Sequence, residues 1–100
     1  MPAPDSWTLQ EANDVLPKVR DLLERLAGDA PGLTPQLVAE ALASDGIVLR
    51  DPLRGLIDFP SRSTDGRPLW LCWVLGEDQV GFWHWPDDGF AGRRPVEEVP

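Results

Sequence analysis

The segments LWLCWVL (residues 69–75) and VGFWHW (residues 80–85) decide the fold of this chain. Together they hold four of the five tryptophans, the only histidine and the only cysteine. Runs of aromatic and branched residues bounded by turn residues are typical of β-strands. We therefore predict two neighbouring strands, followed by a glycine-punctuated tail, DDGFAGRRP (residues 87–95).

Two further strands are predicted upstream, at residues 47–50 and 55–59. The pair Asp65-Gly66 favours a tight two-residue hairpin turn, and residues 76–79 give a weaker turn signal. The sequence thus predicts an antiparallel β-meander of three to four strands over residues 47–95.

The first part of the chain has the pattern of an amphipathic helix. Thr8 and Glu11 have the spacing of a capping box, and Trp7 lies where a hydrophobic staple is expected. Apolar residues then recur at three- and four-residue spacing to about Ala27. The pattern stays in phase through Pro17, so we expect a kink there rather than two helices.

A second, shorter helix follows a turn. Thr34-Pro35 is a cap followed by proline at the first helical position, and this helix runs to about Ser44. We therefore predict one α+β domain over residues 1–100, in which an antiparallel helical hairpin (8–44) packs on the β-meander.

Composition restricts the partners and the compartment. The net charge of −8 disfavours binding to nucleic acid or to anionic membranes. No apolar run approaches the length of a membrane helix, and residues 1–6 read as a loose lead-in without the features of a signal peptide. With a single cysteine as well, the sequence favours a cytoplasmic protein.

Tight turns set the expected strand registers. A two-residue turn at 65–66 places Asp58 opposite Trp73, and a turn at 77–78 places Trp73 opposite Phe82. One face of the sheet is then predicted to carry Leu56, Asp58, Leu71, Trp73, Leu75, Val80, Phe82 and His84. The other is predicted to carry Ile57, Phe59, Trp70, Cys72, Val74, Trp83 and Trp85.

Both predicted faces are apolar, and one helical hairpin covers only one of them. A large aromatic patch is rarely left in water. Either the tail folds back over the second face, or a second copy or another protein packs there. We therefore predict association as a homodimer or accessory module, with an interface of Trp70, Trp83, Trp85 and Phe90.

The candidates for chemistry are His84 and Asp58, which share a predicted face. In these registers their backbones are on the order of 12 Å apart, too far for a direct hydrogen bond, although a water, metal or substrate could bridge them. The alternative is a histidine that is packed between tryptophans and bonds a backbone carbonyl.

The tail offers a candidate anion site of Arg93, Arg94 and Asp88, in which backbone N–H and guanidinium groups bind phosphate or carboxylate. The alternative is a tail docked by Phe90, with Arg93 paired to Asp58, Asp87 or Asp88. No cofactor and no specific metal site are predicted, because no local ligand spacing exists around His84. Cys72 reads as a buried, unreactive thiol.

Five blocks in order, WTLQEAN with LP (7–17), GLIDFP (55–60), LCW (71–73), WH (83–84) and GFAGRRP (89–95), together resemble the bacterial domain of unknown function 2203 family. The helical hairpin looks shorter here than the long pair associated with that family. The resemblance implies that Pro17 is tolerated and that Asp58, His84 and Arg93 belong to a shared pattern. It implies no activity.

Two hypotheses follow from the sequence. The first is association through the tryptophan-rich face. The second is a binding or hydrolytic site for a small anionic ligand or a metal, with His84 as acid, base or ligand and Arg93 holding the anion. Because no established catalytic, metal or nucleotide motif is present, the sequence favours a protein that is not an enzyme and leaves that question open.

Overall fold

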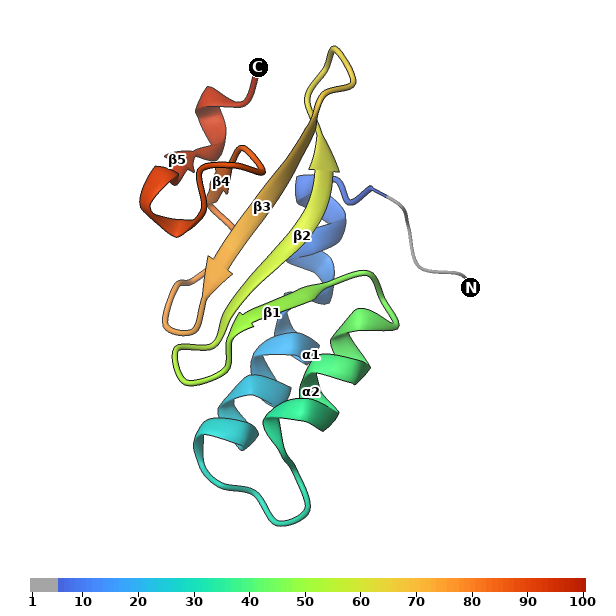
Figure 1. Cartoon of the computed structure of the whole chain (residues 1–100), viewed down its shortest axis with the longest axis vertical. Coiled ribbons are helices and arrows are strands. Elements are labelled where there is room, and N and C mark those ends of the chain that lie inside the picture. The colour runs from blue at the N-terminus through green and yellow to red at the C-terminus, as the bar shows by residue number, and fades with distance from the viewer. Residues whose placement is uncertain (1–5) are drawn as a thin grey trace.

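The computed structural model describes residues 6–100, and residues 1–5, most of the predicted lead-in, lie outside this part. Two α-helices precede an antiparallel sheet with the strand order β1-β2-β3-β4-β5 (Figure 1). The elements are α1 (Leu9–Ala27), α2 (Pro35–Ala43), β1 (Val48–Asp51), β2 (Leu56–Arg62), β3 (Pro68–Val74), β4 (Phe82–His84) and β5 (Arg94–Pro95), with 3-10 turns η1 (Phe90–Gly92) and η2 (Val96–Glu98). The predicted α+β class is confirmed.

The helices begin where their capping residues predict. The Thr8 hydroxyl accepts from the N–H of Glu11 at 3.1 Å, and the Glu11 carboxylate accepts from the N–H of Thr8 at 2.9 Å. Helix α1 continues through Pro17. Trp7 packs edge-on against Phe59, with ring centroids 5.4 Å apart, so the start of α1 is fixed to the sheet. In the described part of the chain, no helix is long and apolar enough to cross a bilayer.

The sheet has five strands rather than three to four. The extra strand β5 consists of two tail residues, which pair with the edge of β4 as Trp83 with Arg94 and Phe82 with Pro95. Figure 1 shows β4, β5 and the tail on the side of β3 opposite to β1. The tail is therefore an integral part of the sheet.

Both predicted hairpin registers are wrong by one residue. Asp58 lies opposite Cys72, not Trp73, and Phe82 also lies opposite Cys72. The first hairpin turns through three residues (64–66), because the N–H of Ser63 donates to the carbonyl of Arg67 at 2.9 Å. Gly66 takes the left-handed conformation (φ 87°) that ends such a loop.

The second connection differs because its turn forms earlier than predicted. The N–H of Glu77 donates to the carbonyl of Val74 at 3.1 Å, and Gly76 between them has φ 111°. The chain then runs to β4 without forming a strand, and Asn13 of α1 accepts from the N–H of Val80 at 2.7 Å. This anchor to the helix replaces the tight turn expected at residues 77–78.

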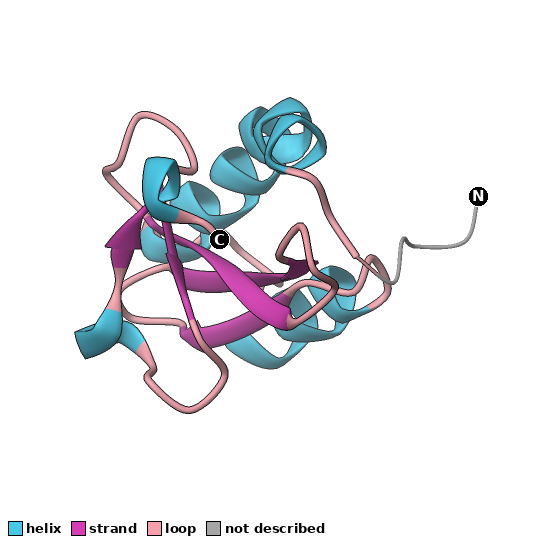
Figure 2. Cartoon of the chain, turned by 90° about the horizontal axis from the view of Figure 1, so that it is seen from above, coloured by secondary structure: helices cyan, strands magenta, loops and turns pink. Residues whose placement is uncertain are grey.

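These registers assign the residues to two faces. The helix-covered face packs into the core with α1 and α2, and its members are Ile57, Phe59, Leu71, Trp73 and Trp83. The tail-covered face carries Leu56, Asp58, Trp70, Cys72, Phe82 and His84. Figure 2 shows the strands in the middle of the molecule with helical segments around them. Trp83 is 1% exposed and belongs to the core, so it is not available as an interface residue.

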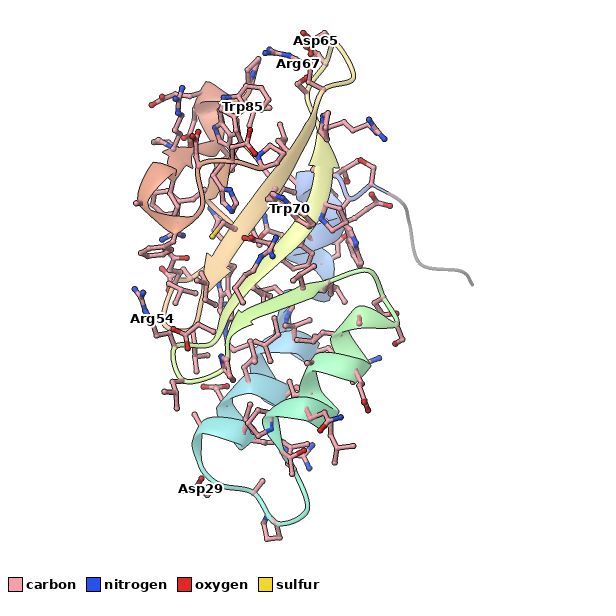
Figure 3. All side chains as sticks on the ribbon, viewed as in Figure 1. Asp29, Arg54, Asp65, Arg67, Trp70 and Trp85 are labelled. Atoms are coloured by element: carbon pink, nitrogen blue, oxygen red, sulfur yellow. The ribbon has the colours of Figure 1, made fainter. Side chains whose placement is uncertain are left out.

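The tail-covered face is shielded by the chain itself. Pro86, Gly89 and Phe90 lie over Leu56, Asp58 and His84, which is the first of the two coverings predicted. Three half-buried rings each have an arginine over them: the guanidinium carbon of Arg50 lies 4.8 Å from the ring centroid of Trp70, and that of Arg54 lies 4.5 Å from that of Phe90. Arg67 lies over Trp85 at 4.6 Å (Figure 3). Within residues 6–100, this face therefore leaves no large aromatic patch bare.

Candidate functional site

Three titratable side chains from three neighbouring strands meet under the tail. Asp58 comes from β2, Cys72 from β3 and His84 from β4, and they are 2%, 1% and 3% exposed. Asp58 and Cys72 are direct cross-strand partners. One carboxylate oxygen, the thiol sulfur and one ring nitrogen all lie within 4.8 Å of one another. The sheet thus gathers them into one buried cluster.

Asp58 and His84 form a direct hydrogen bond, Nε2 to Oδ2, of 3.0 Å. The expectation that they are too far apart is wrong. It counted only backbone spacing in a flat sheet, whereas both side chains extend toward each other and strand twist brings diagonal positions closer. The other ring nitrogen, Nδ1, lies 2.8 Å from the carbonyl oxygen of Trp85. His84 therefore bonds both a carboxyl group and a backbone carbonyl.

The hydrogen bonds define how many protons the pair holds. A carbonyl oxygen only accepts, so Nδ1 of His84 carries a proton. A carboxylate also only accepts, so the bond between Nε2 and Oδ2 holds one further proton on one of these two atoms. In either arrangement the Asp58–His84 pair has no net charge.

Arg50 completes the cluster from β1. Its Nε donates to the same Oδ2 of Asp58 at 2.9 Å, while its side chain is 43% exposed. Within residues 6–100, its two terminal amino groups have no hydrogen-bond partner. The Trp70 ring supports the guanidinium plane. The exposed end of this arginine is a free hydrogen-bonding fork.

A cavity of about 260 Å³ opens above the cluster. It is lined by Arg50, Leu56, Asp58, Cys72, His84, Pro86, Gly89 and Phe90. The second carboxylate oxygen of Asp58, Oδ1, is buried and has no hydrogen-bond partner. Because buried acceptors are nearly always satisfied, this oxygen is available to one further hydrogen-bond donor or to a ligand.

The Cys72 thiol is held in its protonated form. Burial raises the pKa of this thiol to about 12, and the neighbouring negative charge of Asp58 adds to the effect. This agrees with the predicted unreactive cysteine.

The raised pKa predicts a loss of stability at alkaline pH. The folded state keeps the thiol proton, whereas the unfolded state releases it above about pH 9. The contribution of this proton to the free energy of unfolding is therefore complete below pH 9 and is lost toward pH 12. The slope approaches about 1.4 kcal/mol per pH unit. Urea unfolding between pH 8 and 11 measures it. The chain has no tyrosine to obscure the transition.

The variant Cys72→Ala is the control for this effect. Its free energy of unfolding should stay flatter with pH than that of the wild type across the same range. Parallel curves for the two proteins would contradict the raised pKa.

The three residues of the predicted anion site in the tail, Arg93, Arg94 and Asp88, do not line this cavity. Arg93 donates to both carboxylate oxygens of Glu77, at 2.7 and 2.8 Å, and its guanidinium lies 4.1 Å from the Phe82 ring centroid. Neither the predicted pairing with an aspartate nor a shared site with His84 is formed. Arg94 and Asp88 are exposed and do not line the cavity. Arg93 therefore fastens the tail to the β3–β4 connection.

A comparison with protein families identifies one match. A family model described as "Uncharacterized conserved protein (DUF2203)" matches residues 34–96, well over half of the chain. The chain belongs to the DUF2203 family. No curated protein and no solved structure gave a significant match. The DUF2203 match includes all members of the cluster and Glu77 and Arg93, whereas α1 lies before it.

Two residues of the candidate site in this DUF2203 protein were not predicted from the sequence. Arg50 sits on the edge strand, and its position beside Asp58 depends on the pairing of Val48 with Asp58 and on an irregularity between Leu49 and Asp51. Cys72 was placed on the opposite face by the register error. Alternation along residues 47–50 was the available signal for Arg50, since Val48 and Arg50 share a strand face.

Proposed function

We propose that this protein binds a small oxyanion, a carboxylate or a phosphate group, in the cavity above Asp58 and His84. The observation that carries the proposal is the free guanidinium end of Arg50 at the mouth of that cavity. Arginine forks bind carboxylate and phosphate oxygens in pairs, with two parallel hydrogen bonds.

Charge supports an anion rather than a cation at this fork. The Asp58–His84 pair is neutral as a unit, and Cys72 is a neutral thiol. The positive charge of Arg50 therefore has no net counter-charge among the cavity residues. Asp87 and Asp88 are exposed to water and do not line the cavity. A local positive centre is thus present on a chain of net charge −8.

The residues around the cavity orient Arg50, exclude water and limit the size of the ligand. Asp58 holds Nε of Arg50 and so fixes the direction of its fork. Leu56, Pro86 and Phe90 form apolar walls, which strengthen hydrogen bonds inside by excluding water. The volume lies at the small end for ligand pockets, so it suits an anion of few atoms rather than a nucleotide or a nucleic acid.

The variant Arg50→Met tests this function, because it keeps the side-chain stem and removes the charge. Calorimetric titration with inorganic phosphate and with acetate at low ionic strength should show binding that this variant weakens by at least about 10-fold, the cost of losing charge-assisted hydrogen bonds.

The matched control is Arg25→Met, on α1, which removes the same charge from an exposed position away from the cavity. It should bind like the wild type. No binding of either anion by the wild type, or equal weakening in both variants, would remove the proposal.

Association as a homodimer or accessory module is the second candidate. The observation in its favour is that three partly exposed rings, Trp70, Trp85 and Phe90, each have an arginine guanidinium over them. Tryptophan and arginine are the residue types enriched at interface hot spots. The single free thiol of Cys72 suits a reducing compartment such as the cytoplasm.

Sedimentation equilibrium at micromolar concentration tests this candidate. It predicts a dimer that Trp85→Ala converts to a monomer. The control Leu37→Ala, at a leucine on α2 that is 50% exposed, should stay dimeric. A monomeric wild type at these concentrations argues against the homodimer.

A further inference from the structure

The buried cluster has the composition of a transition-metal site. Asp58, Cys72 and His84 supply one oxygen, one sulfur and one nitrogen ligand atom within 4.8 Å of one another. Ligand atoms around tetrahedral zinc lie about 3.3–3.8 Å apart, given bond lengths of about 2.0–2.3 Å. Adjustments of about 1 Å in side-chain position therefore complete the ligand geometry.

Two further features indicate a place for a cation. Oδ1 of Asp58 is buried and has no hydrogen-bond partner, so a ligand position is free. Nδ1 of His84 is bound to the backbone carbonyl of Trp85, which directs Nε2 into the cluster. Metal-binding histidines almost always hold their second nitrogen in this way, and metal-binding carboxylates carry an outer hydrogen bond as Asp58 does from Arg50.

We propose that Asp58, Cys72 and His84 bind a divalent transition metal of the zinc type, with the cavity side left open for a fourth ligand. The mixed donor set excludes Mg²⁺ and Ca²⁺, which require oxygen ligands. Three protein ligands and one open position are typical of zinc sites that bind water or a small ligand. The ligands are far apart in the chain, which explains why no local spacing predicted the site.

Metal binding must release two protons. One is the proton held between Nε2 of His84 and Oδ2 of Asp58, and the other is the thiol proton of Cys72. In the bound form the thiolate and the carboxylate together neutralise the divalent ion, and the imidazole is neutral. The affinity therefore rises with pH, by up to about 100-fold per pH unit where both protons are displaced.

Cobalt(II) is the probe, since it occupies zinc sites and reports its ligands in its absorption spectrum. The protein is used without a histidine tag, because His84 is its only histidine. One equivalent of Co²⁺ should give the visible bands of a tetrahedral ion and a near-ultraviolet band from thiolate-to-metal charge transfer. Zn²⁺ should then displace it. Calorimetry in buffers of different ionisation enthalpy should count two protons released.

The variant Cys72→Ser separates a metal site from a structural cluster. It should abolish the thiolate band, lower the proton count to one and weaken Co²⁺ binding by at least about 100-fold, as expected for a lost ligand. Unchanged affinity, or Co²⁺ bound without a thiolate band, would overturn the proposal. If Cys72→Ser fails to fold, the rate of alkylation of Cys72 in the wild-type protein is measured in partial denaturant. One equivalent of Zn²⁺ should slow this alkylation, and an unchanged rate would overturn the metal proposal.

The metal proposal and the oxyanion proposal can be tested independently of each other with two variants. Arg50→Met should lose phosphate binding and keep the Co²⁺ spectrum, because Arg50 is not a metal ligand. Cys72→Ser should lose the metal and keep phosphate binding in metal-free buffer, because the neutral thiol supplies no charge to the anion.

Discussion

Asp58→Ala is expected to lower the free energy of unfolding by about 3–5 kcal/mol, as is typical when one partner of a buried charged network is removed. Asp58 is hydrogen-bonded to His84 and accepts from Arg50 while it is 2% exposed. Without it, Nε2 of His84 is buried with no partner. Urea unfolding at neutral pH measures the change, and the variant should also lose binding of phosphate and of Co²⁺.

The control for this variant is Asp21→Ala, which breaks an aspartate–arginine pair of the same chemical kind, Asp21 with Arg25, on the exposed side of α1. It should change stability little, because exposed pairs are screened by water. The double variant Asp58→Ala/His84→Ala should cost less than the sum of its single variants, since each removes a group that the other leaves unpaired. An Asp58→Ala protein as stable as the control contradicts the buried network.

Trp73→Ala is the second large effect, with an expected loss of about 3–5 kcal/mol in the free energy of unfolding. The Trp73 side chain is fully buried on the helix-covered face, and its Nε1 donates to the carbonyl of Glu77 at 3.1 Å. The substitution leaves a large cavity between α1 and the sheet and removes a hydrogen bond from the β3–β4 connection.

The matched variant is Trp85→Ala, at a half-buried ring beyond the end of β4. Thermal and urea unfolding should show a loss less than half that of Trp73→Ala. A reversed order would place Trp73 on the outer face and contradict the observed register.

The helices follow from local chemistry that the sequence shows directly. The capping pair at Thr8 and Glu11 and the Thr34-Pro35 start act within one helical turn, so no distant part of the chain decides them. The sheet registers depend on loop lengths, and one extra residue in the turn after Ser63 moved every pairing of β2 with β3. A hairpin signal such as Asp65-Gly66 does not distinguish a two-residue from a three-residue loop.

The two register errors explain what was found and what was missed at the site. Each error assigned the side chains of β3 to the wrong face relative to the neighbouring strand. The two errors cancelled between β2 and β4, whose side chains were assigned to the correct faces relative to each other. Asp58 and His84 were therefore correctly placed on one face, whereas Cys72 was placed on the wrong one. The partner of Arg93 was missed because Glu77 lies in a connection whose path is fixed by contacts with α1, through Asn13 and Val80.

The most direct test of the account is nitrogen NMR of the single histidine during titration with inorganic phosphate. With ¹⁵N-labelled histidine, the two ring signals both belong to His84, which lines the proposed cavity beside Arg50. We predict that phosphate shifts these signals saturably in the wild type and leaves them in place in Arg50→Met. Signals that do not move in the wild type, or that move equally in both proteins, would contradict an oxyanion site at Arg50, Asp58 and His84.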